Sequence, residues 1–145
     1  MFESLIKVAD NVQKLDRDRI LSQVFEDVAV RDEIRNLNIE QMYDFGVGND
    51  GVTLGQYTFR TKQTKEFNGQ RFDHITLRDT EEFHDSIRVG SDGKNIVITG
   101  DMQKPDQNLE IRFPNALGLT EENWNFIRES IIPNIRQIVM QEIKA

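Results

Sequence analysis

The sequence predicts an α+β fold, in which helices at both ends of the chain flank a small antiparallel sheet of three to four strands. Residues 1–45 and 119–144 repeat apolar side chains at steps of three and four, the spacing of the buried face of a helix. Between them, two β-branched runs flank an Asp-Gly pair at positions 92–93, which is typical of a tight hairpin turn. We expect a single domain, because 145 residues suffice for one core and are too few for two ordinary ones.

The first region, residues 1–45, is predicted to be helical. One apolar stripe includes Phe2, Leu5 and Val12, and the pattern resumes after Asp16, which leaves open whether one bent helix or two are formed. A further short helix is expected to begin at an N-cap, Asn38, and to end where Gly46 adopts a left-handed conformation.

Residues 46–70 are predicted to form a loop followed by an extended arm. The arm covers residues 52–65, where threonines favour the extended conformation and apolar side chains are sparse. A segment with so little material for a core is suited to lie against a neighbouring subunit. We expect the interface between subunits to include Tyr57, Phe59, Thr61 and Lys62.

The sheet is predicted within residues 71–113. Residues 71–77 alternate apolar and polar side chains, residues 86–89 and 95–99 form the hairpin, and residues 109–113 alternate strictly before Pro114. A short helix before the hairpin is expected to be capped by Asp79, with Glu82 three residues later completing a capping box.

The last region, residues 119–144, is predicted to be a long helix. Thr120 can cap its N-terminus, and Pro133 predicts a kink near Ile132 because proline interrupts the helical hydrogen bonds. Trp124 begins its apolar stripe, and we expect this side chain to meet Phe83 and Ile87 in one core.

Composition excludes several classes of protein. The absence of cysteine excludes disulfides, thiolate metal sites and a cysteine nucleophile. The chain has 25 acidic and 18 basic residues and a net charge of −7, which disfavours binding to the phosphates of nucleic acids. No signal peptide or run of about 20 apolar residues is present, so we expect a soluble protein without membrane contact.

The two histidines offer the main alternative, a small metal-dependent hydrolase or nuclease. His74 and His84 lie near Asp73, Asp79 and Asp85, all side chains that can bind a divalent metal. Their spacing matches no metal motif, and surface or half-buried histidines explain the pattern more simply. We therefore expect no catalytic activity and no cofactor. A cytoplasmic adaptor with one bacterial partner is a third hypothesis.

Two segments of the chain resemble a known family. The first is Leu-Arg-Asp-Thr-x-x-Phe-x-x-Ser-Ile-x-Val at positions 77–89, with Glu81 where the family has glycine. The second, within residues 41–57, contains Gln-Met-Tyr-Asp-x-Gly, then Asp-Gly, then Leu-Gly-x-Tyr. Both are similar to segments of the tail-completion and head-tail joining proteins of tailed phages and prophages, notably the versions from phages of Bacteroidetes.

The resemblance implies a structural virion protein. Such a protein would form a homo-oligomeric ring in the neck, bridging the portal or connector proteins and the tail proteins. It would reside in the virion, after assembly in the cytoplasm of the host bacterium. Net acidity is compatible with this role, because it would repel DNA that passes through the bore of a ring.

Overall fold

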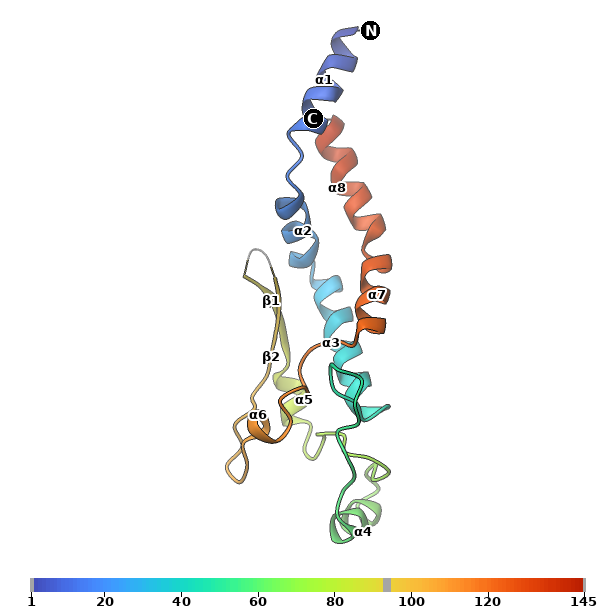
Figure 1. The fold of residues 1–145 in the computed structure, drawn as a ribbon, viewed down its shortest axis with the longest axis vertical. Coiled ribbons are helices and arrows are strands. Elements are labelled where there is room, and N and C mark those ends of the chain that lie inside the picture. The colour runs from blue at the N-terminus through green and yellow to red at the C-terminus, as the bar shows by residue number, and fades with distance from the viewer. Residues whose placement is uncertain (1, 93–94, 145) are drawn as a thin grey trace.

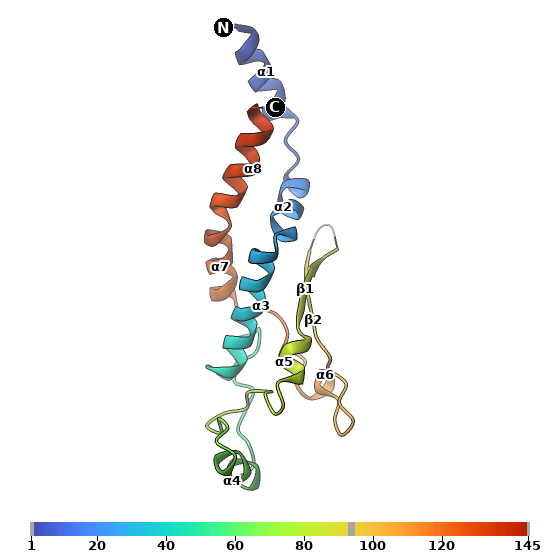
Figure 2. The same ribbon diagram turned by 180° about the vertical axis from the view of Figure 1, so that it is seen from behind.

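The computed structural model describes residues 2–92 and 95–144. The molecule is elongated, with a helical rod at one end and a set of short helices and loops at the other (Figure 1). The end of the first helix meets the end of the last helix at the far end of the rod, and a hairpin runs along the other side of the N-terminal helices (Figure 2). The fold is therefore α+β, mostly helical, with a small sheet.

Three helices form the N-terminal region, so its predicted helical character is confirmed. The sequence left open one helix or two, and the structure has three. They are α1 (Phe2–Gln13), α2 (Arg17–Glu26) and α3 (Val28–Tyr43). Aspartates mark both breaks. The carboxylate of Asp16 accepts hydrogen bonds from the amides of Asp18 and Arg19, and that of Asp27 accepts one from Ala29. Each aspartate satisfies backbone donors that a helix start leaves free.

The C-terminal region bends as predicted. Helix α7 (Glu121–Ser130) begins at Thr120, whose hydroxyl accepts a hydrogen bond from the Asn123 amide at 3.2 Å. Helix α8 (Ile132–Lys144) follows with Pro133 as its second residue. Proline is tolerated in the first turn of a helix, where the missing N–H would have no helical partner. The chain therefore restarts as a new helix at the position where the kink was expected.

The hairpin consists of β1 (Arg88–Ser91) and β2 (Ile96–Thr99), which pair antiparallel with Arg88 opposite Thr99. The predicted hairpin is confirmed, although its Asp-Gly turn includes Gly93, which lies outside the described residues. On the described side of the turn, the Asp92 amide donates to the Asn95 carbonyl oxygen at 3.1 Å. The sheet of the described residues contains only these two strands.

The expected third and fourth strands are wrong. Residues 109–113 include a helical turn, α6 (Leu109–Arg112), and residues 71–77 contain no strand among the described positions. Asn108 explains the first error, because its side chain accepts from the amides of Glu110 and Ile111 and starts a helix. Five alternating residues are too few for periodicity to outweigh such a cap.

The extended arm is also corrected. Its second half belongs to helix α4 (Phe59–Phe67), which begins at Thr58 where the hydroxyl accepts from the Thr61 amide at 3.3 Å. The Lys, Gln and Glu residues of this helix have good helix propensity, which together with the cap outweighs the β-propensity of its threonines. Residues 52–58, by contrast, form no helix.

Helix α5 (Glu82–Ser86) confirms the predicted short helix before the hairpin, but its start differs from the prediction. The residue before its first turn is Glu81, which has a left-handed φ of 70° and makes no capping hydrogen bond with its side chain. Asp79 therefore does not cap this helix. The capping-box prediction identified the right kind of element and placed its boundary two residues too early.

Two core clusters hold the molecule together, and Ile98 of β2 packs against both. The buried residues of the first are Met42, Ile75, Phe83, Ile87, Leu109, Phe113 and Ala116. Those of the second are Val24, Val30, Ile34, Leu119, Ile127 and Ile131, with Trp124 packed against them. The expected contact of Phe83 and Ile87 is thus confirmed within one cluster. Trp124 belongs to the other cluster, so the expected three-residue core is wrong.

Two buried polar side chains join α3 to the segment before α7, and we call this contact the polar junction. Asn38 donates to the carbonyl oxygen of Ala116 at 3.0 Å and accepts from the Gly118 amide at 2.9 Å. Gln41 donates to the Gly118 carbonyl oxygen and accepts from the Thr120 amide, at 3.0 and 2.9 Å. Asn38 lies in the middle of α3 (Val28–Tyr43), so the prediction that it begins a new helix is wrong.

Candidate functional site

The histidines and aspartates of the metal hypothesis make separate contacts. His74 Nε2 lies 2.7 Å from the Tyr43 carbonyl oxygen and Nδ1 lies 3.2 Å from Asp73. His84 is buried, with Nε2 2.9 Å from the Thr76 carbonyl oxygen. Among residues 2–92 and 95–144, no three or more His, Asp or Glu side chains are arranged to hold a metal ion. The structure therefore does not bring the proposed ligands together.

His84 is held in a neutral form. Burial lowers the pKa of its imidazole below the ordinary 6.5, and the carbonyl of Thr76 opposes this shift by accepting a hydrogen bond. Because a carbonyl can only accept, the proton of the neutral ring lies on Nε2. This histidine has a structural role, and its ring packs against that of Phe83, a residue of the first core cluster.

The four residues predicted as a subunit interface are in different environments. Tyr57 packs against the first core cluster, and its hydroxyl accepts from the Thr76 amide at 3.0 Å. Phe59 is exposed at the start of α4, whereas Thr61 and Lys62 are half-buried. Tyr57 therefore stabilises the fold of this subunit, and only Phe59 presents a large apolar side chain to solvent.

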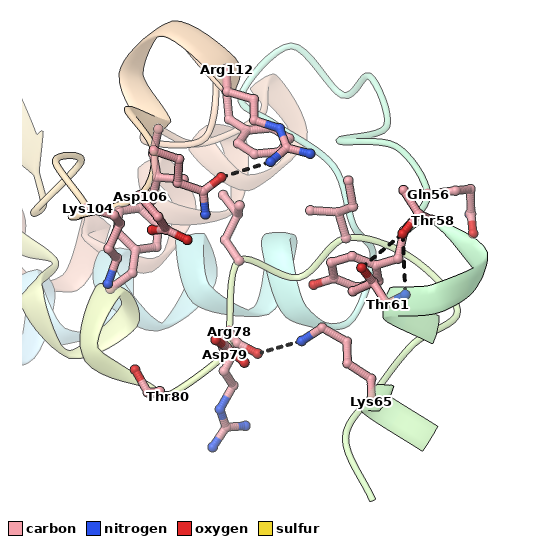
Figure 3. Close-up of a pocket in the computed structure, with 17 residues that line it drawn as sticks. Gln56, Thr58, Thr61, Lys65, Arg78, Asp79, Thr80, Lys104, Asp106 and Arg112 are labelled. Atoms are coloured by element: carbon pink, nitrogen blue, oxygen red, sulfur yellow. Dashed lines mark hydrogen bonds between the residues drawn. The ribbon is translucent and has the colours of Figure 1, made fainter. Parts of the chain in front are cut away.

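A cleft of about 380 Å³ lies between α4, the segment before α5, and α6 (Figure 3). Its apolar walls come from the first core cluster and from side chains packed on it: Tyr57, Ile75, Leu77, Phe83, Leu109 and Phe113. Polar side chains surround these walls, among them Thr58, Thr61, Lys104, Asp106 and Arg112. Ligand pockets in proteins have volumes of roughly 300–1,000 Å³ and combine apolar walls with a few polar groups.

Lys65 is the buried charged residue of this cleft. Lys65 is 6% exposed. Its Nζ donates to the Arg78 carbonyl oxygen at 3.4 Å and lies 4.7 Å from the centre of the Tyr57 ring. The Arg78 side chain is engaged elsewhere, over the Tyr43 ring and with Glu81, whose hydrogen bond raises the pKa of the guanidinium. Of these two cations, Lys65 is therefore the one whose charge is not neutralised by an acidic side chain among the described residues.

A second candidate surface lies at the other end of the molecule, and we call α1 together with α8 the apolar arm. No residue of Phe2–Gln13 or Ile132–Lys144 is buried. In α1 the exposed fractions are 77% for Phe2, 59% for Leu5 and 61% for Ile6. The two helices contact each other, with Asn11 donating to the Ile143 carbonyl oxygen at 2.9 Å, and α1 runs on beyond the end of α8 (Figure 1).

Sequence reasoning identified the apolar stripe of α1 but not its exposure, and it did not single out Lys65. The stripe has the same spacing whether its face is buried or not, so periodicity cannot reveal a missing partner. Lys65 gave no signal, because one lysine in a polar segment is ordinarily solvated. The position of Lys65, one helix turn after Thr61, becomes meaningful only when α4 folds back onto residues 75–80.

Comparison with known proteins finds no matching family model, no matching curated protein and no matching solved structure. Among the described residues, no helix combines the length and the apolar character needed to cross a membrane.

Proposed function

We propose that this protein is a structural, non-catalytic virion protein of a tailed phage, similar to the tail-completion and head-tail joining proteins. It forms a homo-oligomeric ring in the neck, between the portal or connector proteins and the tail, and is assembled in the cytoplasm of the host bacterium. Two segments, residues 41–57 and 77–89, support the choice of family by their resemblance. The observation that carries the oligomeric role is the apolar arm.

The apolar arm requires a partner. Helix α1 has 12 residues and α8 has 13, and isolated helices shorter than about 12–15 residues are marginal in water. In proteins, such helices gain their stability by burying an apolar face. Ile135 and Ile138 of α8 pack against the second core cluster, but no residue of either helix is buried, so this requirement is met only in part. A second set of helices would bury the exposed side chains.

The partner that fits the arm is a second copy of the same arm. Its charges balance: Glu3, Lys7 and Asp10 in α1, and Arg136, Glu142 and Lys144 in α8. The arm is thus formally neutral in a chain of net charge −7. Two acidic chains can therefore meet through their arms without repulsion between net charges there. The arm also has the right size, because one partner contributes roughly 20–30 residues to a stable interface.

Mass in solution tests this proposal. We expect the wild-type protein to have a mass of at least two chains of 16.9 kDa each in sedimentation or light-scattering measurements. The Ile6→Glu variant should shift to 16.9 kDa, because a charge then lies in the apolar arm. Ile111→Glu is the matched control, since Ile111 is 80% exposed on α6 and should leave the mass unchanged. A monomeric wild type at about 100 μM, far above the Kd of ordinary stable interfaces, contradicts the oligomer.

The virion role has its own test. We expect the protein to be present in purified phage particles and, by electron microscopy, to occupy the neck. Particles produced without the gene should contain heads and tails that fail to join. An oligomer that is absent from purified particles would leave the arm interface intact and overturn the phage assignment.

A further inference from the structure

The side chain of Lys65 is incompletely paired. An ammonium group has three N–H donors, and the structure supplies one acceptor, the Arg78 carbonyl oxygen at 3.4 Å, together with the face of the Tyr57 ring. None of the ion pairs formed by the described residues includes Lys65. Burying a charge is costly unless it is paired, so this site favours an anionic group beside Nζ.

The surroundings of Lys65 define which anion fits. Lys104 and Arg112 add positive charge at the edge of the cleft, with Lys104 3.8 Å from Glu82 and Arg112 donating to Gln107 at 2.8 Å. Asp79 and Asp106 line the same cleft. Their charges would repel a phosphate, which has close to two negative charges, more strongly than a carboxylate, which has one.

The walls of the cleft add a second requirement. Tyr57, Phe83 and Phe113 contribute aromatic surface within a volume of about 380 Å³, which suits an apolar side chain of a bound molecule. Figure 3 shows the Lys65 side chain directed across the cleft toward the Arg78 carbonyl, so an apolar group on the walls and an anion at Nζ would be neighbours. A polypeptide supplies both groups where a carboxylate adjoins an apolar residue.

We propose that this cleft is a binding site for a polypeptide segment of a partner protein, in which a carboxylate binds Lys65 and an adjoining apolar side chain fills the space between α4 and α6. The site lies at the opposite end of the molecule from the apolar arm, so it does not depend on the oligomeric role (Figure 1). In a ring, it would leave each subunit able to hold one further protein.

The test uses small molecules that carry the two groups. The full-length protein is titrated, with detection by NMR chemical shifts, with N-acetyl-phenylalanine, with N-acetyl-aspartyl-phenylalaninamide and with N-acetyl-phenylalaninamide. The first two place the carboxylate at a chain end or on a side chain, and the third has none. We expect saturable shifts at residues of the cleft for one or both carboxylates, and at least tenfold weaker binding of the compound without a carboxylate.

Variants then locate the charge. Lys65→Met removes the charge, keeps most of the length of the side chain, and should weaken carboxylate binding at least tenfold while leaving the circular dichroism spectrum unchanged. Lys62→Met, in the same helix and outside the cleft lining, is the matched control and should bind as the wild type does. Equal binding by Lys65→Met and wild type, equal binding of the compounds with and without a carboxylate, or tighter binding of phenyl phosphate would each overturn the proposal.

Discussion

Two regions of this protein reverse the usual distribution of polar and apolar side chains. At the polar junction, Asn38 and Gln41 are buried almost completely, whereas in the apolar arm Phe2, Leu5 and Ile6 are exposed. The polar side chains can be buried because each finds both a donor and an acceptor in the backbone of residues 116–120. The apolar side chains are exposed because no described segment of this subunit covers them. Burial thus depends on the available partners more than on polarity.

The largest effect is expected in the first core cluster, which provides the reference for both regions. Phe83→Ala should lower the free energy of unfolding by about 3–5 kcal/mol, because a large side chain that is 2% exposed leaves a cavity. Phe67→Ala is the matched control, since Phe67 is 90% exposed and should change the value by less than about 0.5 kcal/mol. Chemical denaturation measures both. Equal midpoints for the two variants would show that Phe83 is not a core residue.

Next in size is the polar junction. Asn38→Ala should lower the free energy of unfolding by about 2–4 kcal/mol, because the Ala116 carbonyl and the Gly118 amide both lose their partner. Asn36→Ala, an exposed position of the same helix, is the control and should stay within about 0.5 kcal/mol of wild type. A loss below about 1 kcal/mol at Asn38 would mean that water takes over the hydrogen bonds of the two freed backbone groups. Burial at the polar junction would then not depend on protein partners, contrary to the comparison with the apolar arm.

The apolar arm should respond to concentration. At a dilution at which the chain is monomeric, Leu5→Ala should change the free energy of unfolding by less than about 0.5 kcal/mol, because the side chain is exposed. At concentrations that favour assembly the same variant should be clearly less stable than wild type, because association stabilises the folded chain by mass action. Thermal unfolding over a dilution series measures this, and a penalty independent of concentration would place Leu5 in a core.

The smallest expected effect is the pH dependence due to His84. Burial lowers the pKa of this imidazole, so between that lowered pKa and about 6.5 the unfolded chain binds a proton that the folded chain does not. Stability should therefore fall as the pH drops below about 6.5 and be independent of this group above it. His84→Gln keeps a donor for the Thr76 carbonyl and should flatten this part of the profile. An unchanged slope would show that other groups produce it.

Local signals in the sequence determined most of the helical architecture. The caps at Asp16, Asp27 and Thr120 and the restart at Pro133 each act within a few residues, through a side chain that satisfies the nearest backbone amides or a ring that removes one. The hairpin and Gly46, with a φ of 63°, follow the same rule. For these elements the physical cause lies inside the segment. The Thr120 cap, the interruption at Pro133, the hairpin and Gly46 were predicted from the sequence, but the caps at Asp16 and Asp27 were not identified.

The tertiary structure decided what these elements pack against. The polar junction joins α3 to residues nearly 80 positions away, and Lys65 is buried only because α4 folds onto the segment before α5. Residues 109–113, by contrast, include a helical turn because of the local cap at Asn108, and among the described residues no third strand pairs with the hairpin. Hydrophobic spacing specifies which face of a helix is apolar but not which other segment covers it. That choice depends on contacts between distant parts of the chain, and in the apolar arm those contacts leave Phe2, Leu5 and Ile6 exposed.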